Sequence, residues 1–214
     1  EMVLMSDVAM DAFKNSYQAF VEKDYSDRDY PASYSSYYGL PSWLSGNKFT
    51  KLTIGENVTR IGNYAFFNCD SLTSIVVDEN NQTFKTIEGI LYSKDGEVLI
   101  HYPIAKQGVS FVVPYCVTTL AQNCFRETKL EKIILHDGIT EIQARAFIYA
   151  SKLKQIIIPN GITVIYEYTF DSCDNLESIA LPTTLSVVEF SAFAYCDSLS
   201  TVYYSGTEES WENI

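Results

Sequence analysis

The feature that most constrains this chain is an internal repeat of about 23 residues. Segments of the form small-Phe-x-x-small-x-x-Leu recur at 65–72, 146–153, 169–176 and 192–199, and 124–130 has the same form with one residue deleted. The phenylalanine column is Phe66, Phe125, Phe147, Phe170 and Phe193. Its steps are 125 − 66 = 59, then 22, 23 and 23 residues, so the first step equals two repeats and about 13 inserted residues. One further coil therefore lies between Phe66 and Phe125.

Each Phe segment runs into a strand pattern, Leu-x-x-Ile-x-hydrophobic, which is followed by Pro in the clearest copies at 153–159 and 176–182. The same frame fits 72–78, 130–136 and 199–205, and counterparts at 49–55 and 111–114 bring the predicted strands to seven. A second short apolar pattern follows at 58–61, 117–120, 139–142, 162–165 and 185–188. Because one coil cannot bury its own Leu, Ile and Phe, the coils must stack and share a core.

The repeat resembles the BspA-like leucine-rich repeats, whose units read L-x-x-I-x-L-P-x-x-V-x-x-I-x-x-x-A-F-x-x-C-x-x-L. Residues 153–199 match this form almost position by position, and the resemblance covers 49–205. It implies a leucine-rich-repeat solenoid, a β-rich right-handed superhelix of about seven coils of 22–23 residues. It also implies a bacterial protein that is extracellular or on the cell surface, and a protein partner such as a host matrix or plasma protein.

The solenoid is expected to be interrupted and closed by segments outside the repeat. An insertion at about 79–108 is predicted to form a β-hairpin, because alternating apolar residues flank a turn at Lys94-Asp95-Gly96. Residues 206–214 form a C-terminal cap fragment, and 202–214 resembles the closing segment of such arrays, with Trp211 placed to cover the last coil.

The first 48 residues match nothing in the repeat. Helical spacing of apolar residues from Ser6 or Asp7 to about Asp24 predicts an amphipathic helix, which either caps the first coil or binds another partner. The Tyr-, Ser- and Pro-rich segment 24–43 is expected to pack over this cap or to contact a ligand.

Charge and hydropathy exclude several partners. The net charge is −12, which opposes binding to nucleic acid and to anionic lipid head groups. We expect no membrane span, because no stretch approaches the roughly 20 apolar residues that a bilayer requires. The N-terminus shows no basic segment followed by an apolar one, so no secretory signal is visible in this sequence.

The cysteines and histidines occupy positions that indicate a structural role rather than a catalytic or metal-binding one. Cys69, Cys173 and Cys196 share one position in their coils with Ala150, so they are expected to point inward as free thiols. No CxxC pair exists and no His lies beside a Cys, which argues against a zinc site. His101 and His136 have no nucleophile at a motif-like position. We therefore expect no enzyme, no cofactor and no metal.

The predicted strands place alternate residues on an outer face, in two parallel columns. The first column is Lys51, Ser74, Ser110, Lys132, Gln155, Ser178 and Thr201, and the second is Thr53, Val76, Val112, Ile134, Ile157, Ala180 and Tyr203. The second column is unexpectedly apolar for a solvent face, which indicates an interaction site. Two alternatives stay open: the β-branched residues occur here because they favour strands, or another segment of the chain covers this face.

These observations favour a non-enzymatic, adhesin-like protein-binding module. The predicted site residues on the strand face are Val76, Val112, Lys132, Ile134, Gln155, Ile157, Ala180 and Tyr203. Insertions in repeat proteins often project onto a binding face, so Tyr92, His101 and Tyr102 of the hairpin are a second candidate site. The alternatives are a structural spacer or an accessory domain of a larger surface protein. A carbohydrate ligand is disfavoured, because Tyr203 is the only aromatic residue on the proposed face.

Overall fold

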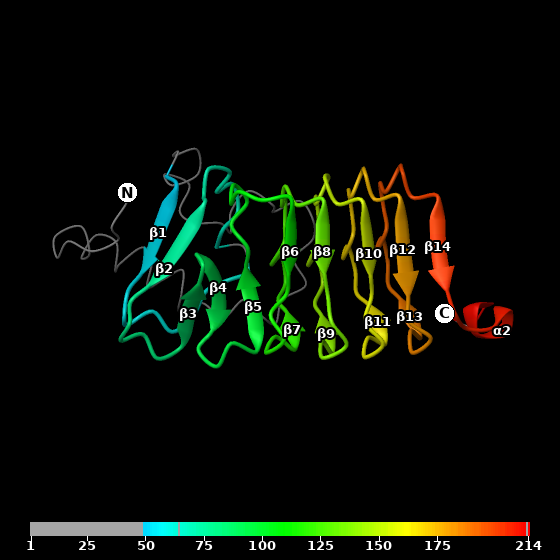
Figure 1. Ribbon diagram of the computed structural model, residues 1–214, viewed down its shortest axis with the longest axis horizontal. Helices are drawn as coiled ribbons and strands as arrows, with labels where there is room; N and C mark the ends of the chain where they lie inside the picture. The colour runs from blue at the N-terminus through cyan, green and yellow to red at the C-terminus, as the bar shows by residue number, and fades with distance from the viewer. Residues whose placement is uncertain (1–48, 64, 213) are drawn as a thin grey trace.

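The computed structural model describes residues 49–63, 65–212 and 214. Over this part, the chain forms a β-solenoid of about seven turns with repeats about 23 residues apart, and its coils succeed one another along the long axis (Figure 1). This confirms the fold that the repeat predicts. The expected N-terminal helix and the Tyr-rich segment lie outside the described residues.

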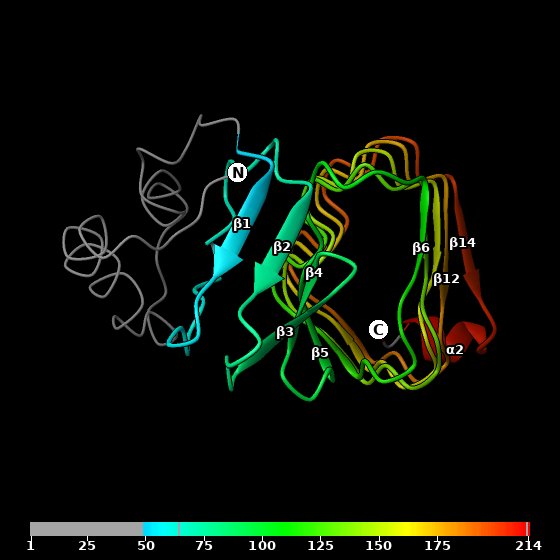
Figure 2. The same cartoon turned by 60° about the vertical axis from the view of Figure 1, so that its left-hand side comes forward.

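The main sheet of the solenoid is built from one strand of each regular coil. Its strands are β6 (Ser110–Val112), β8 (Lys132–Ile134), β10 (Gln155–Ile157), β12 (Ser178–Leu181) and β14 (Thr201–Tyr204). They form a parallel sheet in the order β14-β12-β10-β8-β6, and Figure 2 shows them stacked behind one another. Equivalent repeat positions pair, as Ile156 does with Ile179, so the register follows from the 23-residue period.

The second apolar pattern forms shorter strands on another side of each coil. These are β7 (Thr119–Leu120), β9 (Glu141–Ile142), β11 (Val164–Ile165) and β13 (Val187–Val188), and β7 pairs with β9 as β11 does with β13. The fifth copy of this pattern, at 58–61, forms no strand.

The first two strands form a sheet of their own. β1 (Lys51–Ile54) pairs in parallel with β2 (Ser74–Val77) and with no strand of the main sheet, so the prediction of one continuous seven-stranded surface is wrong. The insertion lies beside β2: the Ile75 amide donates to the Gly89 carbonyl at 2.9 Å. Gly89 has φ 79°, and a Cβ there would lie 2.6 Å from the Ser74 hydroxyl oxygen, so this contact requires glycine.

The insertion is a three-stranded meander rather than a simple hairpin. β3 (Phe84–Ile87), β4 (Ile90–Ser93) and β5 (Val98–His101) pair in antiparallel order, and β5 then pairs in parallel with β7. The turn at 94–96 is confirmed, because the Asp95 carboxylate accepts from the Glu97 amide at 2.9 Å and Gly96 has φ 93°. Strand β3 was not predicted. The meander thus extends the second sheet instead of projecting from the solenoid.

The phenylalanine column runs through the core of successive coils. The rings of Phe125, Phe147, Phe170 and Phe193 stack with centroid separations of 5.4, 5.0 and 5.4 Å. The amides of Phe125, Phe147 and Phe170 donate to the next coil, as Phe125 does to the Ala146 carbonyl at 2.8 Å. The Tyr102 amide makes the equivalent hydrogen bond, to the Cys124 carbonyl at 2.8 Å. In both cases the acceptor is the residue directly before the Phe of the next coil. Tyr102 therefore occupies the Phe position of the coil hidden in the insertion.

The turns around this column use left-handed backbone at the same places in successive coils. The residues two positions before and after the Phe have positive φ in the coils of Phe125, Phe147, Phe170 and Phe193: Asn123, Glu127, Arg145, Tyr149, Tyr168, Ser172, Ser191 and Tyr195. Several of their amides point to the next coil, as Tyr149 donates to the Asp171 carbonyl at 2.8 Å. These inter-coil hydrogen bonds offset a conformation that costs non-glycine residues about 1–2 kcal/mol each.

The core divides at the insertion into two clusters of buried residues. One lies under β1, β2 and part of the meander and includes Leu72 and Leu91, and the other runs through the rest of the array. Asn81 anchors the bend after β2, since its fully buried amide donates to the Gly55 and Val58 carbonyls and accepts from the Thr83 and Phe84 amides.

The C-terminal segment forms the short helix α2 (Glu208–Glu212). Trp211 lies 5.4 Å from the Tyr204 ring, between centroids, and keeps 45% of its surface exposed, so its cover of the last coil is partial.

The cysteines follow the repeat as expected. Cys173 and Cys196 lie inward in successive coils, where their thiols donate to the Phe147 and Phe170 carbonyls at 3.2 and 3.1 Å. All five cysteines are free thiols. Burial raises the pKa of Cys69 to about 12 and also raises that of Cys124, which keeps both thiols protonated and unreactive.

Candidate protein-binding surface

The outer face of the main sheet carries a continuous line of apolar side chains across its five strands. We call this the apolar stripe; it consists of Val112, Ile134, Ile157, Ala180 and Tyr203. Val112 pairs with Ile134, and Ala180 pairs with both Ile157 and Tyr203, so the stripe runs at right angles to the strands. With strands about 4.8 Å apart, it extends roughly 20 Å.

The stripe is open to solvent. Val112, Ile134, Ile157 and Tyr203 expose 56, 40, 72 and 62% of their surface, and Ala180 is half-buried. On β8, β10 and β12 the residues between these positions are buried, and Ile133 and Ile156 expose 3 and 2%. At the two ends of the sheet, Phe111 is half-buried and Val202 exposes 44% of its surface. The predicted alternation of outward and inward residues is therefore observed on the three middle strands of the main sheet and is lost at β14. No described segment covers these side chains.

A polar border accompanies the stripe. Lys132 and Gln155 lie exposed beside Ile134 and Ile157 on the same strands, as predicted. At the strand entrances, Lys154 pairs with Glu131 at 2.7 Å. The hydrogen bond and the charge of Lys154 lower the pKa of Glu131, and Glu131 raises that of Lys154, so both stay charged near neutral pH.

An aromatic edge lies where β6 and β8 end. Tyr115 exposes 86% of its surface and packs against His136, with ring centroids 4.9 Å apart. His136 Nε2 lies 3.0 Å from the Pro114 carbonyl oxygen, and Nδ1 accepts from the Gly138 amide at 3.1 Å. The repeat predicts the strand end at His136, but no sequence signal identifies Tyr115 as its neighbour.

Val76 does not belong to this surface. It lies half-buried on β2, whose only sheet partner among the described strands is β1. Its inclusion in the predicted site depended on the seven-stranded sheet, which the meander interrupts.

The three predicted hairpin residues are in the core. Tyr92, His101 and Tyr102 expose 1, 3 and 2% of their surface, so none offers a contact to a partner, and their assignment as a binding site is wrong. The reason is that the insertion pairs with β7 and fills a place in the stack, so its aromatic residues pack inward. Burial raises the pKa of Tyr92 and Tyr102 and lowers that of His101 to about 3, so all three are neutral at pH 7.

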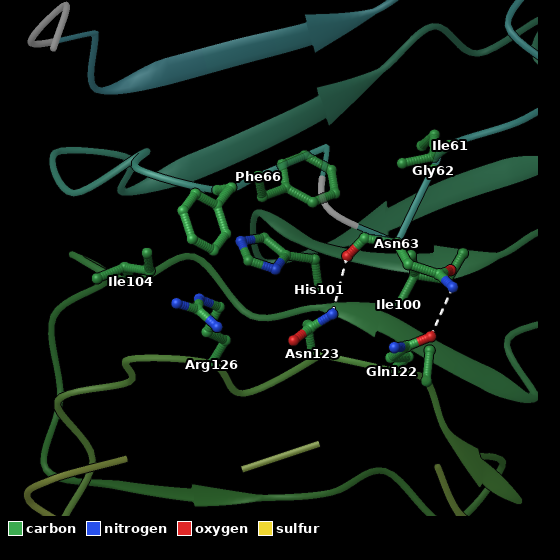
Figure 3. Close-up of a pocket in the computed structure, with 12 residues that line it drawn as sticks. Ile61, Gly62, Asn63, Phe66, Ile100, His101, Ile104, Gln122, Asn123 and Arg126 are labelled. Atoms are coloured by element: carbon green, nitrogen blue, oxygen red, sulfur yellow. Dashed lines mark hydrogen bonds between the residues drawn. The ribbon is translucent and has the colours of Figure 1, made fainter. Parts of the chain in front are cut away.

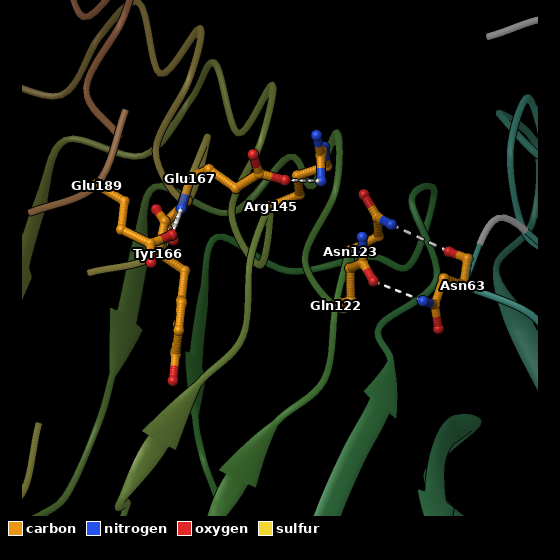
Figure 4. Close-up of polar contacts among 8 residues, drawn as sticks. Asn63, Gln122, Asn123, Arg145, Tyr166, Glu167 and Glu189 are labelled. Carbon is orange, nitrogen blue, oxygen red and sulfur yellow. Dashed lines mark hydrogen bonds and ion pairs between the residues drawn. The ribbon is translucent and has the colours of Figure 1, made fainter. Parts of the chain in front are cut away.

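The turn side of the solenoid has polar links that were not predicted from the sequence. The side-chain oxygen Oε1 of Gln143 accepts from the Gln122 backbone amide at 3.0 Å, and the Glu189 carboxylate accepts from the Glu167 backbone amide at the same distance further along the array. Figure 4 shows the contact of Glu189 together with the Arg145–Glu167 ion pair, 2.7 Å long. These links join coils and satisfy backbone donors, so they are structural.

The turn side also exposes apolar rings, but they form no line comparable with the stripe. Phe190 and Tyr195 expose 75 and 73% of their surface. Phe190 contacts Tyr168 edge to face at 5.9 Å. Charged side chains interrupt this side, as at Arg145 and Glu167.

Comparison with known proteins places the repeat in a family. A family model described as a BspA type leucine rich repeat region matches residues 41–92 and 106–213 in six copies. The chain therefore belongs to the BspA-type leucine-rich repeat family. The gap in the match, residues 93–105, begins at the end of β4 and includes β5 of the meander, where the period is broken.

Solved structures agree with this placement. A leucine rich cell surface protein from Faecalibacterium prausnitzii superposes with a TM-score of 0.64 at 28% identity, over 81% of this chain and 52% of that one. The pneumococcal vaccine antigen PcpA gives 0.62 at 26% identity, over 75% of this chain and 46% of that one. A leucine-rich repeat protein from Eubacterium ventriosum shares the fold, with a TM-score of 0.61 at 22% identity over 72% of this chain and 48% of that one.

This chain thus spans about half the length of these structures. The search of curated proteins gives no match. Within the described residues, no helix has both the length and the apolar character to cross a bilayer.

Proposed function

We propose that this chain is a non-enzymatic recognition module that binds a protein partner through the apolar stripe. The observation that carries the proposal is the exposure of Val112, Ile134, Ile157 and Tyr203 in one uninterrupted line on a rigid sheet. Exposed contiguous apolar surface is uncommon on soluble proteins unless it is used for an interaction.

The chemistry of the stripe defines the partner that would fit it. Branched aliphatic residues in the middle and Tyr203 at one end suit a protein that presents an apolar ridge. Lys132, Gln155 and the Glu131–Lys154 pair would form the polar rim that surrounds such a contact. The middle of the stripe would carry most of the binding energy, because rim charges contribute little.

The setting proposed for this module is the bacterial surface or the extracellular medium. The support is the family and the likeness to a bacterial leucine rich cell surface protein. An adhesin-like role, with a host matrix or plasma protein as partner, is the specific form that we propose.

A binding screen against immobilised purified matrix and plasma proteins tests this proposal. The chain is compared with the double variant Ile134→Asp, Ile157→Asp and with the matched control Phe190→Asp, Tyr195→Asp. Both variants replace two exposed apolar residues by two carboxylates, so they change net charge equally but alter different sides of the solenoid. Circular dichroism verifies that each is folded.

We expect saturable binding to one protein, a loss of at least about 100-fold in affinity for the stripe variant, and a change below about threefold for the control. Equal binding by the stripe variant and the wild type would contradict the proposed site. If the wild type binds none of the immobilised proteins, the result would instead favour the role of a structural spacer.

A further inference from the structure

The boundary between the two core clusters encloses a small cavity of about 40 Å³, shown in Figure 3. It lies between the turn that carries Phe66, strand β5 and the turn that carries Phe125. Its walls combine apolar and polar side chains: Ile61, Phe66, Ile100, His101, Asn123 and Arg126. It is on the turn side of the solenoid, so it is separate from the apolar stripe.

Unpaired polar atoms converge on this cavity. In the described part of the chain, three buried side-chain nitrogen or oxygen atoms lack a hydrogen bond: His101 Nε2, Asn123 Oδ1 and Arg126 Nε. All three belong to residues that line the cavity. His101 and Asn123 expose only 3 and 5% of their surface. Since buried polar groups in folded proteins are nearly always paired, this coincidence indicates a missing hydrogen-bonding partner.

The three side chains are held in place by other contacts. The His101 ring stacks on Phe66, with centroids 4.1 Å apart, and Asn123 Nδ2 donates to the Asn63 carbonyl at 3.0 Å. The Arg126 guanidinium lies over Phe67 and Tyr149, 4.3 and 4.7 Å from the ring centroids. These contacts hold the side chains in place, and no described residue completes their hydrogen bonds.

We propose that this cavity is a binding site for a small neutral group that both donates and accepts hydrogen bonds, supplied either by solvent water or by a primary amide. Asn123 Oδ1 requires a donor, and Arg126 Nε requires an acceptor. His101 is neutral because burial keeps its pKa at about 3, so its Nε2 serves as donor or acceptor according to its tautomer.

The charges around the cavity disfavour an ionic guest. Arg126 is the charged residue of the wall, and it repels a cation. Its Nε lies 2.9 Å from the Glu127 carboxylate, an ion pair that forms no hydrogen bond but already balances its charge. Asn123 Oδ1 turns lone pairs toward the cavity, which opposes an anion. A purely apolar guest would leave all three polar atoms unpaired.

The volume matches a guest of a few non-hydrogen atoms. A single water needs about 10–15 Å³ of such space, so the cavity accommodates water or one carboxamide group. A bound guest would bridge the first coils, through Phe66 and His101, to the following array, through Asn123 and Arg126. This function is independent of the partner surface on the strand face.

The test uses the full chain labelled with ¹⁵N in its histidine rings. The sequence has only two histidines, so His101 reports on the cavity and His136 is an internal control. Acetamide and acetate are titrated separately, because they have nearly the same shape and differ in the donor group and the charge. A high-resolution crystal structure without either probe shows whether an ordered water occupies the cavity.

We expect acetamide to shift the His101 resonances saturably, with an affinity at least about tenfold higher than that of acetate, and to leave those of His136 in place. The variant Asn123→Leu should weaken the acetamide response at least about tenfold, since it removes the acceptor. If acetamide has no effect but an ordered water bonds both His101 Nε2 and Asn123 Oδ1, the guest comes from solvent and the proposal holds.

Two results would overturn the proposal. One is acetate binding as tightly as acetamide. The other is a dry cavity together with no acetamide response in the wild type. Both are read from the wild-type protein, so they stand even if Asn123→Leu does not fold.

Discussion

The regular array from β6 to β14 and the insertion region from β1 to β5 differ in how their coils pack and form hydrogen bonds with one another. In the regular array, each coil repeats the previous one, so Phe stacks on Phe, and the amides of Phe125, Phe147 and Phe170 donate to a carbonyl of the next coil. In the insertion region, His101 and Tyr102 take the stacking positions and the sheet is interrupted. Where this region meets the regular array, three buried polar atoms of His101, Asn123 and Arg126 lack a hydrogen bond.

The difference shows what a strict period provides. When neighbouring coils have the same geometry, one solution for packing and hydrogen bonding serves every interface. An insertion of about 13 residues changes the geometry of the coils on either side of it, so the repeated packing and hydrogen bonds no longer fit there. Single residues with special properties, such as Gly89 and Asn81, make the contacts instead. Matched substitutions in the two regions test whether they differ in this way.

The largest effect is expected in the regular array. Phe147→Ala should lower the free energy of unfolding by about 3–5 kcal/mol, because Phe147 is fully buried between two stacked rings. Phe66→Ala, at the half-buried end of the column, should cost about 2 kcal/mol. Urea titrations followed by circular dichroism measure both. Equal losses would show that the two regions are packed alike.

The next effect concerns the bend after β2. Asn81→Ala should cost about 3 kcal/mol, because it removes four hydrogen bonds at a fully buried position. The control is Asn175→Ala, whose exposed side chain makes one bond to the Ser151 carbonyl and should cost less than about 1 kcal/mol. A cost for Asn81→Ala no greater than that of the control would refute the anchoring role.

A pH effect should distinguish His101. Its pKa is about 3 in the folded chain and near 6.5 when exposed, so between these values the unfolded state binds the extra proton. Stability from this group is complete above pH 6.5 and is lost as the pH falls, by about 2 kcal/mol between pH 7 and pH 5.

The comparison that isolates this contribution is His101→Phe, which keeps an aromatic ring on Phe66 and cannot titrate. Its unfolding free energy should change by about 2 kcal/mol less than that of the wild type over the same pH interval. Parallel pH profiles for the two proteins would contradict burial of a neutral His101.

The smallest effect on stability is expected on the apolar stripe. Ile157→Asp should change the unfolding free energy by no more than about 0.5 kcal/mol, since Ile157 is mostly exposed, whereas Ile156→Asp one residue earlier should unfold the coil. Thermal melts of the two variants make the comparison. A large loss for Ile157→Asp would mean that this face is covered by another part of the chain.

Much of the regular array could be predicted from the sequence. The Phe column and the Leu-x-x-Ile pattern fix which residues point inward, so the strands, the inward cysteines and the exposed Ile134 and Ile157 followed from the period. The step of 59 residues also revealed a hidden coil, which the structure places at Tyr102.

The insertion region could not be predicted to the same depth. Its alternating pattern indicates strands but does not show which sheet they join, and that pairing decides whether Tyr92 and His101 face solvent or core. The left-handed turn residues were also missed. Tyr149 and Ser172 have no glycine-like signature, and their conformation is set by hydrogen bonds to the neighbouring coil.

The most direct test of the central claim is photo-crosslinking from the stripe itself. A benzoylphenylalanine is introduced at Ile157 in one protein and at Phe190 in another, and each is irradiated with the same mixture of purified matrix and plasma proteins. The account predicts a specific crosslink from position 157 that excess unlabelled wild type suppresses, and none from position 190. A specific crosslink from position 190 alone would place the partner on the turn side and contradict the claim.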